Sequence, residues 1–260
     1  MAVLKKKVIF IVGSNFSGST LAGCVLGANK LSAFENWHVG EIHSFFKPQA
    51  NRYGKPEKAV LSSAGAIWDS VDYSVGYHGA YDELIYRPPE TDVLIDSSKT
   101  PNNLEIQLEH RCQEKFDFRC VMTYKPFNRI WLSSLARGNK NHKIKSIILN
   151  YRRQLNLLKD YRVPFIGINT EDFIGKPELH TEALCEFCEI PYFSGKHEYW
   201  RWPFAHLYGS DTQRDHLNDP SKAGYDLGRP GSDGEFTNDF LEKPEIKELE
   251  KDVISHLVKL

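Results

Sequence analysis

The residues best suited to chemistry near the amino end lie in one short loop, Gly13–Thr20, directly after the apolar run Val8–Val12. The run is typical of a buried strand, and the residues after the loop, Leu21–Gly27, have helical character. Where a strand leads through a glycine-bearing loop into a helix, backbone N–H groups and the helix dipole converge on one place and bind an anion. The loop therefore predicts a site for a negatively charged ligand group; the plainer alternative is a turn that only starts a helix.

The loop is one residue away from the nucleotide-binding pattern G-x4-G-K-[ST]. Gly13 and Gly18 keep its spacing and Thr20 supplies its hydroxyl, but Ser19 stands where the lysine belongs. Transfer of a γ-phosphate would lose its main positive partner, which argues against a kinase. The serine variant resembles the 5′-phosphosulfate loop of sulfotransferases that use 3′-phosphoadenosine 5′-phosphosulfate (PAPS). The resemblance implies that the donor is bound by Ser14, Asn15, Phe16, Ser17, Gly18, Ser19 and Thr20.

A second segment, 229–240, resembles the sulfotransferase motif R-K-G-x-x-G-[DE]-W-K-N-x-F. The matching residues, in register, are Arg229, Gly231, Gly234, Asn238 and Phe240. Pro230 replaces the motif's lysine and Phe236 its tryptophan. The resemblance implies that Arg229 binds the 3′-phosphate by charge-assisted hydrogen bonds and that Gly231 lets the backbone approach it. A glycine-rich surface loop is the alternative.

Further segments fit the same family. Lys125 and Ser133 keep the eight-residue separation of an arginine and a serine that hold the 3′-phosphate in sulfotransferases. Either lysine replaces that arginine, or the arginine is displaced by one position. Arg129 either compensates for that change or is a solvated helix charge. Asp96–Lys99 matches the D-S-S-K of bacterial sulfotransferases, and 169–178 resembles a scaffold passage of the family. The resemblance extends over most of the chain, about 46–90 excepted.

Sulfuryl transfer requires a base for the acceptor proton and a cation for the leaving phosphate oxygen. Glu41 lies in a G-E segment like the one that carries the catalytic glutamate in many family members, and His43 is the second candidate base. Phe16 departs from the pattern, because the family usually has arginine or lysine there. Lys99, expected at an adjacent strand end, is the first candidate to supply the missing charge, and Lys125 is the second.

These residues require a sheet to position them. Four short apolar runs, each followed by polar residues and a helical segment, predict parallel strands with crossover helices: Val8–Val12, Val93–Ile95, Cys120–Tyr124 and Phe165–Ile168. Helices are predicted over Ile144–Lys159, over Glu178–Cys188 and, with Pro244 in its first turn, near the carboxyl end. In the second helix we expect Leu179, Ala183, Leu184 and Phe187 to face inward; in the third, Ile246, Leu249, Val253 and Leu257.

The fold class predicted is therefore α/β, a parallel sheet flanked by helices, as in P-loop-like sulfotransferases. Its 260 residues suit one domain, with an acceptor-side insertion or cap at about 46–90. The formal net charge of −1 argues against a nucleic-acid binder. Five cysteines favour reduced thiols in a cytoplasm, and the pair Cys185 and Cys188 favours helix packing over a metal site.

Together these observations predict a PAPS-dependent sulfotransferase that releases 3′-phosphoadenosine 5′-phosphate (PAP), needs no metal and does not associate with membranes. A non-catalytic PAP- or PAPS-binding relative is the alternative, because Phe16 removes a charge used in the chemistry; a P-loop kinase is a further one. The acceptor is expected to be a small molecule or a carbohydrate. Whether the sulfuryl group goes to a hydroxyl or to an amine of the acceptor is not predicted, and lipid, peptide and alkaloid acceptors remain open. The oligomeric state is not predicted.

Overall fold

The computed structural model describes residues 5–29, 37–42, 72–86, 92–136, 144–202, 206–207, 215–216, 219–225 and 241–258. Its strands are β1 (Lys7–Val12), β2 (Trp37–Gly40), β3 (Val93–Lys99), β4 (Asp117–Tyr124), β5 (Phe165–Asn169) and β6 (His206–Leu207). Its α-helices are α1 (Ser19–Gly27), α3 (Gly76–Tyr86), α4 (Pro101–Glu109), α5 (Cys112–Lys115), α6 (Phe127–Ala136), α7 (Ile144–Asp160), α8 (Thr170–Gly175), α9 (Pro177–Cys188) and α11 (Pro244–Ser255). Short 3-10 turns cover Tyr73–Val75, Tyr199–Arg201 and Pro220–Lys222.

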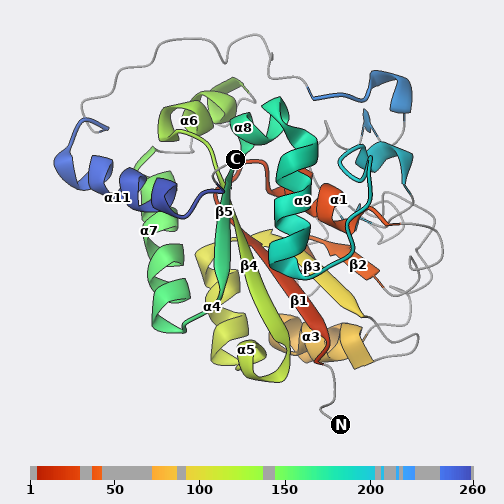
Figure 1. The fold of residues 1–260 in the computed structure, drawn as a ribbon. Coiled ribbons are helices and arrows are strands. Elements are labelled where there is room, and N and C mark those ends of the chain that lie inside the picture. Colours follow the sequence, from red (N-terminus) through yellow and green to blue (C-terminus); the bar gives the residue numbers. More distant parts are fainter. Residues whose placement is uncertain are drawn as a thin grey trace.

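The strands form one sheet in the order β5-β4-β1-β3-β2-β6, and every pairing in it is parallel. All carboxyl ends therefore meet at one edge, with β1 in the middle of the sheet (Figure 1). After β1 the chain runs to β2 and β3 on one side and only later to β4 and β5 on the other. The loop after β1 thus lies at the point where the strand order reverses, where open α/β sheets bind ligands.

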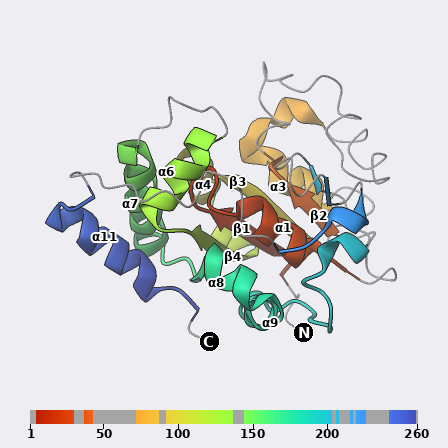
Figure 2. The same cartoon turned by 90° about the horizontal axis from the view of Figure 1, so that it is seen from above.

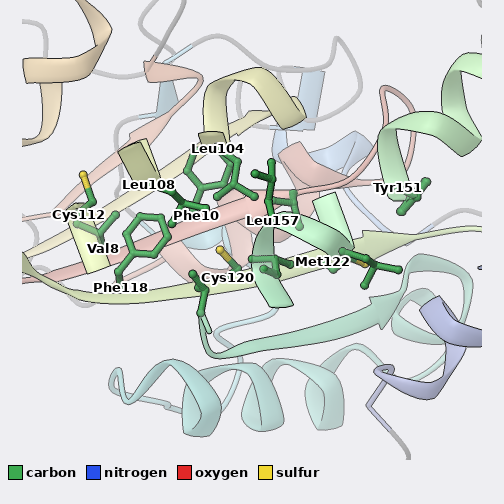
Figure 3. Packing of buried hydrophobic residues seen from close by; sticks show 14 of the residues in the cluster. Val8, Phe10, Leu104, Leu108, Cys112, Phe118, Cys120, Met122, Tyr151 and Leu157 are labelled. Atoms are coloured by element: carbon green, nitrogen blue, oxygen red, sulfur yellow. The ribbon is translucent and has the colours of Figure 1, made fainter. Parts of the chain in front are cut away.

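Helices cover both faces of the sheet, as Figure 2 shows from above. On one face, α3, α4, α6, α7 and α11 bury a large apolar cluster with the side chains of β1 and β4 (Figure 3). On the other, α1, α8 and α9 pack on the alternate side chains of the same strands. Because successive side chains of a strand point to opposite faces, a strand covered on both faces is apolar throughout. β1 meets this condition, since Val8–Val12 are fully buried.

All four predicted strands and the three predicted helices are confirmed, with ends that differ by a few residues. The predicted inward residues of the last helix are also buried, except Leu257, which lies beyond the helix and packs on the core partly exposed. β2 and β6 were not predicted. β2 has four residues and β6 two, so neither carries an apolar run, and both are strands only because a neighbour pairs with them.

The prediction for the inner face of α9 is right for Leu184, which is buried, and in part for Phe187, which packs partly buried on the core, but wrong for Leu179. The buried residues of this helix are His180, Thr181, Leu184, Cys185 and Cys188, while Leu179 is half exposed. The buried stripe is offset by one residue, about 100° around the helix. The two cysteines and His180 fill the space under the helix in place of the larger apolar side chains.

All five cysteines are buried free thiols. Burial raises the pKa of Cys185 to about 11, because the thiolate would lose its hydration. Within the part of the chain that the structure describes, no three histidine, cysteine or acidic side chains gather as metal ligands. No described helix combines the length and the apolar character needed to cross a bilayer.

The predicted insertion contributes to the main core. Tyr77, Tyr81, Leu84 and Ile85 of α3 belong to the same apolar cluster as β1 and β4. Residues 43–71 and 87–91 lie outside the described residues, so the assignment of 46–90 as an acceptor-side cap stays a prediction.

A buried lysine closes the far end of α1. Lys196 is fully buried, and its ammonium donates to the carbonyl of Ala28, which follows the last turn of the helix. It also lies 5.2 Å from the centre of the Phe193 ring. Burial lowers the pKa of Lys196 to about 8, because the charged form is desolvated.

We predict that Lys196 makes stability rise with pH. Between about 8 and the ordinary lysine value near 10.4, the unfolded chain binds the proton that the folded chain has released, so raising the pH favours folding. The effect is on the order of 3 kcal/mol across that window and is absent below it. Urea unfolding at several pH values should show this slope in the wild type relative to Lys196→Met; parallel curves for the two proteins would contradict it.

Candidate active site

The loop after β1 is held in shape by bonds within itself and to β4. The backbone N–H of Ser17 donates to the carbonyl of Ser14 (3.2 Å), and its hydroxyl donates to the same carbonyl (2.7 Å). That hydroxyl also lies 2.8 Å from Thr123 Oγ1, which donates to the carbonyl of Val12 (3.1 Å). The Ser17 side chain, predicted to bind PAPS, thus forms hydrogen bonds to Ser14 and Thr123 and fixes the shape of the loop.

Two glycines in the loop have no substitute. At Gly13 (φ +144°) an added Cβ would lie 2.5 Å from Thr123 Oγ1, and at Gly18 (φ +99°) it would lie 2.5 Å from Thr170 Oγ1. Thr170 approaches so closely because its hydroxyl donates to the carbonyl of Ser17 (2.5 Å). The glycine spacing read from the sequence therefore serves close packing of the loop against β4 and α8.

The loop has the properties of an anion site. Helix geometry leaves the first N–H groups of α1 without partners inside the helix, and the N-cap residue Gly18 has no side chain to cap them. Ser19 and Thr20 begin that helix. The hydroxyl of Ser14 is buried and has no hydrogen-bond partner among the described residues, which is costly unless another group, such as a ligand, provides one. These features fit the phosphate end of a nucleotide donor.

Phe16 and Asn15 occupy the outer part of the loop. Phe16 is half-buried with φ +71°, a left-handed conformation that is strained for a bulky side chain. Asn15 is exposed. The family's usual cation at position 16 is therefore replaced by an aromatic ring held in a strained backbone.

A charged pair lies at the same edge of the sheet. The ammonium of Lys99, the last residue of β3, contacts the carboxylate of Glu41, which follows the last residue of β2. Both side chains are mostly buried, with 14% of Lys99 and 19% of Glu41 exposed. The two residues are 58 positions apart in the chain, and the parallel pairing of β2 with β3 brings them together.

Lys99 also lies beside the loop Gly13–Thr20, which we call the anion loop. In the ladder between β1 and β3 its partner is Val12, the residue before Gly13. The side-chain amide of Gln154, fully buried in α7, donates to the carbonyl of Gly13 (2.9 Å) and to that of Lys99 (2.5 Å). One side chain thus joins the start of the loop to the end of β3.

The backbone of Lys99 is strained. Its φ is +42°, and the N–H of Thr100 donates to the carbonyl of Ser98 (2.5 Å), which makes a γ-turn centred on Lys99. Asn103 of α4 donates its side-chain amide to the same carbonyl (2.9 Å), and Thr100 caps that helix. Such strain persists only where the surroundings fix it, and it concentrates at functional sites.

The residues predicted for the 3′-phosphate are only partly described. Lys125 lies between β4 and α6, and Ser133 lies on α6; both are half-buried. The guanidinium of Arg129 is 3.3 Å from Glu171, so it has a protein partner in the structure. Arg229, Gly231 and His43 lie outside the described residues, and their roles stay predictions.

Sequence reasoning missed several residues that fix the site. Besides Gln154, Tyr151 donates its hydroxyl to the carbonyl of Thr123 (2.7 Å), and Asp96 accepts a hydrogen bond from the N–H of Ile42 (3.2 Å), just after the end of β2. Gln154 was detectable in principle, because it is a polar residue on the apolar stripe of a predicted helix. Asp96 lies within the D-S-S-K motif, and Ser98 of the same motif donates to it, but its other partners, Ile42, Tyr77 and Tyr81, are distant in the chain.

With this geometry established, the fold can be compared with known structures. Over 98% of this chain and all of the other, it aligns with the sulfotransferase domain from the curacin biosynthetic pathway, with a TM-score of 0.52 and 14% identity. The sulfotransferase domain of the olefin synthase of Synechococcus PCC 7002 aligns over 100% of this chain and 98% of the other, with a TM-score of 0.56 and 13% identity. This is the sulfotransferase fold. Models of known families and curated proteins do not match the chain in sequence.

The sulfotransferase fold is shared across the full length of these domains, at an identity that establishes architecture alone. The predicted fold class, α/β with a parallel sheet flanked by helices as in P-loop-like sulfotransferases, is thereby confirmed. The fold does not determine the reaction of this protein, because one fold hosts many activities. The reaction depends on the residues of the site.

We predict that Gly18→Ala destabilises the protein by about 2 kcal/mol or more. The alanine would combine an unfavourable positive φ with a collision against Thr170. Urea unfolding measures the loss. Gly175→Ala is the matched control, because its added Cβ meets no atom of the described residues within 4 Å, and its stability should be unchanged or higher. Equal stabilities of the two variants would contradict the described loop.

Proposed function

We propose that this protein is a PAPS-dependent sulfotransferase that moves a sulfuryl group to a hydroxyl or amine of a small-molecule or carbohydrate acceptor. The observation that carries the proposal is the contact of Glu41 with Lys99 beside the anion loop, in a chain with the sulfotransferase fold. A base and a cation next to a phosphate-binding loop are what sulfuryl transfer requires.

Different residues of the site would bind the two ends of the donor. The first turn of α1 and the hydroxyl of Ser14 would hold the 5′-phosphate end of the donor. When bound, PAPS supplies the sulfuryl group. Arg229, Gly231, Lys125 and Ser133 are the candidates for the 3′-phosphate. The described residues fit the donor at its 5′ end.

Glu41 takes the acceptor proton in this mechanism. Its carboxylate contacts the ammonium of Lys99, and a carboxylate is the form of the side chain that can accept a proton. As Glu41 becomes neutral its hold on Lys99 weakens, and the lysine charge is then available to the leaving phosphate oxygen. The two charges would thus be used in sequence, in a site largely removed from water.

Lys99 fulfils the role that Phe16 cannot. Lys99 is the ladder partner of Val12 and shares Gln154 with Gly13, so its backbone is fixed next to the anion loop. A non-catalytic PAP-binding protein is the second candidate function, and Phe16 is the observation that favours it. Turnover decides between the two.

We predict tighter binding of PAP than of AMP, because the 3′-phosphate has residues of its own. Arg229→Ala should weaken PAP binding about 30-fold or more and leave AMP binding nearly unchanged, since it removes charge-assisted hydrogen bonds worth roughly 2 kcal/mol. Calorimetry measures both affinities. Lys115→Ala, at the opposite edge of the sheet in an exposed pair with Asp82, is the control. Equal affinities of the wild type for PAP and AMP would contradict the proposed PAPS-dependent function.

We predict that Glu41→Gln keeps PAP affinity and loses roughly two to four decades of turnover. Lys99→Ala should also damage turnover more than binding, and Phe16→Arg should partly restore it by returning a cation to the loop. Turnover is followed as PAP released from PAPS, with water, a simple phenol or a primary alcohol as acceptor. Near-normal turnover in Glu41→Gln would indicate that His43 is the base. If the wild type showed no turnover with any acceptor, the non-catalytic candidate function would be favoured.

A further inference from the structure

A fully buried carboxylate lies directly behind the Glu41–Lys99 pair. Asp96 belongs to β3, and none of its surface is exposed. One of its oxygens, Oδ1, accepts from the N–H of Ser98 (2.8 Å), from the hydroxyl of the same serine, and from the N–H of Ile42 (3.2 Å). A buried charge surrounded by donors in this way is held in one orientation.

The other oxygen of Asp96 is bound by two tyrosines of α3. Tyr77 donates to Oδ2 at 2.6 Å and Tyr81 at 2.7 Å. α3 is itself fixed to α4, because the side-chain amide of Gln107 donates to the carbonyl of Tyr77 (2.6 Å). The pKa of Asp96 is raised, because the effect of burial exceeds that of the hydrogen bonds from Ser98, Tyr77 and Tyr81, which act in the opposite direction. With these donors all turned toward it, the carboxylate serves as an acceptor.

The bond to Ile42 connects this carboxylate to the site. In the ladder between β2 and β3, Gly40 is the partner of Asp96, and β2 ends there. Two residues later, the N–H of Ile42 donates to the side chain of Asp96, where a continued strand would donate to a backbone carbonyl of its neighbour. Glu41 is therefore held between two anchors, the strand pairing of Gly40 and the hydrogen bond of Ile42, and Ile42 is fully buried.

We propose that Asp96 is a positioning residue, whose buried carboxylate holds the backbone around Glu41 so that the Glu41 side chain meets Lys99. The inference rests on the proposed function, in which Glu41 is the base. Asp96 acts through Glu41 and touches neither donor nor acceptor. The same aspartate also shapes the turn that carries Lys99, because Ser98 donates to it from the preceding position.

The test is a double-mutant cycle. Asp96→Asn keeps the shape of the side chain and replaces a charged acceptor by a neutral amide. We expect about a 10–100-fold fall in turnover, since a displaced base loses its geometry, with PAP affinity unchanged within about threefold. In the Glu41→Gln background Asp96→Asn should have no further effect, because the residue it positions is already inactive. An equal fall in both backgrounds would overturn the proposal.

A control separates positioning from stability. Leu84→Ala removes a buried side chain from α3, the helix that carries Tyr77 and Tyr81, without touching the hydrogen bonds of Asp96. It should lower the melting temperature while turnover at 25 °C stays within about twofold of the wild type. If Leu84→Ala and Asp96→Asn lost turnover in proportion to their loss of stability, Asp96 would be a stabilising residue only.

A second measurement needs no ligand and no Asp96 variant. In the wild type, the amide of Ile42 should exchange with solvent at least about 100-fold more slowly than an unprotected amide, because it donates to a buried carboxylate. Exchange at the unprotected rate would overturn the proposal even if Asp96→Asn failed to fold. A wild type that bound no PAP would instead refute the proposed function, and the amide would still decide whether Asp96 holds the backbone beside Glu41.

Discussion

The structure depends on the hydrogen-bonded ladder in which β1 lies between β3 and β4. Val8–Val12 are fully buried, so β1 contributes to both apolar clusters and joins the two halves of the sheet. Because the pairings are parallel, this ladder also fixes where the chain leaves the sheet. The anion loop follows β1, Lys99 ends β3 and Lys125 follows β4, all at one edge.

That edge is strained, and buried polar side chains hold it. Phe16 and Lys99 both adopt positive φ, which neither residue type favours. Gln154 and Tyr151, one turn apart on α7, reach the carbonyls of three strand ends, those at Gly13, Lys99 and Thr123. An apolar residue at position 154 would pack against the sheet equally well but would leave two carbonyls without donors. The helix thus carries polar groups inside the core because the strand ends require them.

The charges at this edge are arranged in layers. Glu41 and Lys99 form the outer layer, largely but not wholly buried, where a proton and a leaving oxygen could reach them. Asp96 forms the inner layer, with its oxygens bound by Ser98, Ile42 and the tyrosines of α3. An inner carboxylate that is fully hydrogen-bonded has a fixed position, whereas an outer pair that keeps some access to solvent can exchange partners. In the proposed function, this division would keep the backbone of the region rigid while the outer pair changes partners.

The sequence by itself determined the parts of this protein that depend on near neighbours. The four longer strands, the three helices and the spacing of Gly13 and Gly18 follow from local periodicity and from turn geometry, which a short window of sequence contains. Glu41 and Lys99 were also found as candidates, each from its own segment.

Only the tertiary structure decided what depends on distant partners. β2 and β6 are strands because neighbours pair with them, and α9, packed on the sheet, buries Cys185 and leaves Leu179 half exposed. The contact of Glu41 with Lys99 spans 58 positions, and the hydrogen bond of Asp96 to Ile42 spans 54. No local pattern encodes such contacts, because they exist only once parallel pairing has brought the strand ends together.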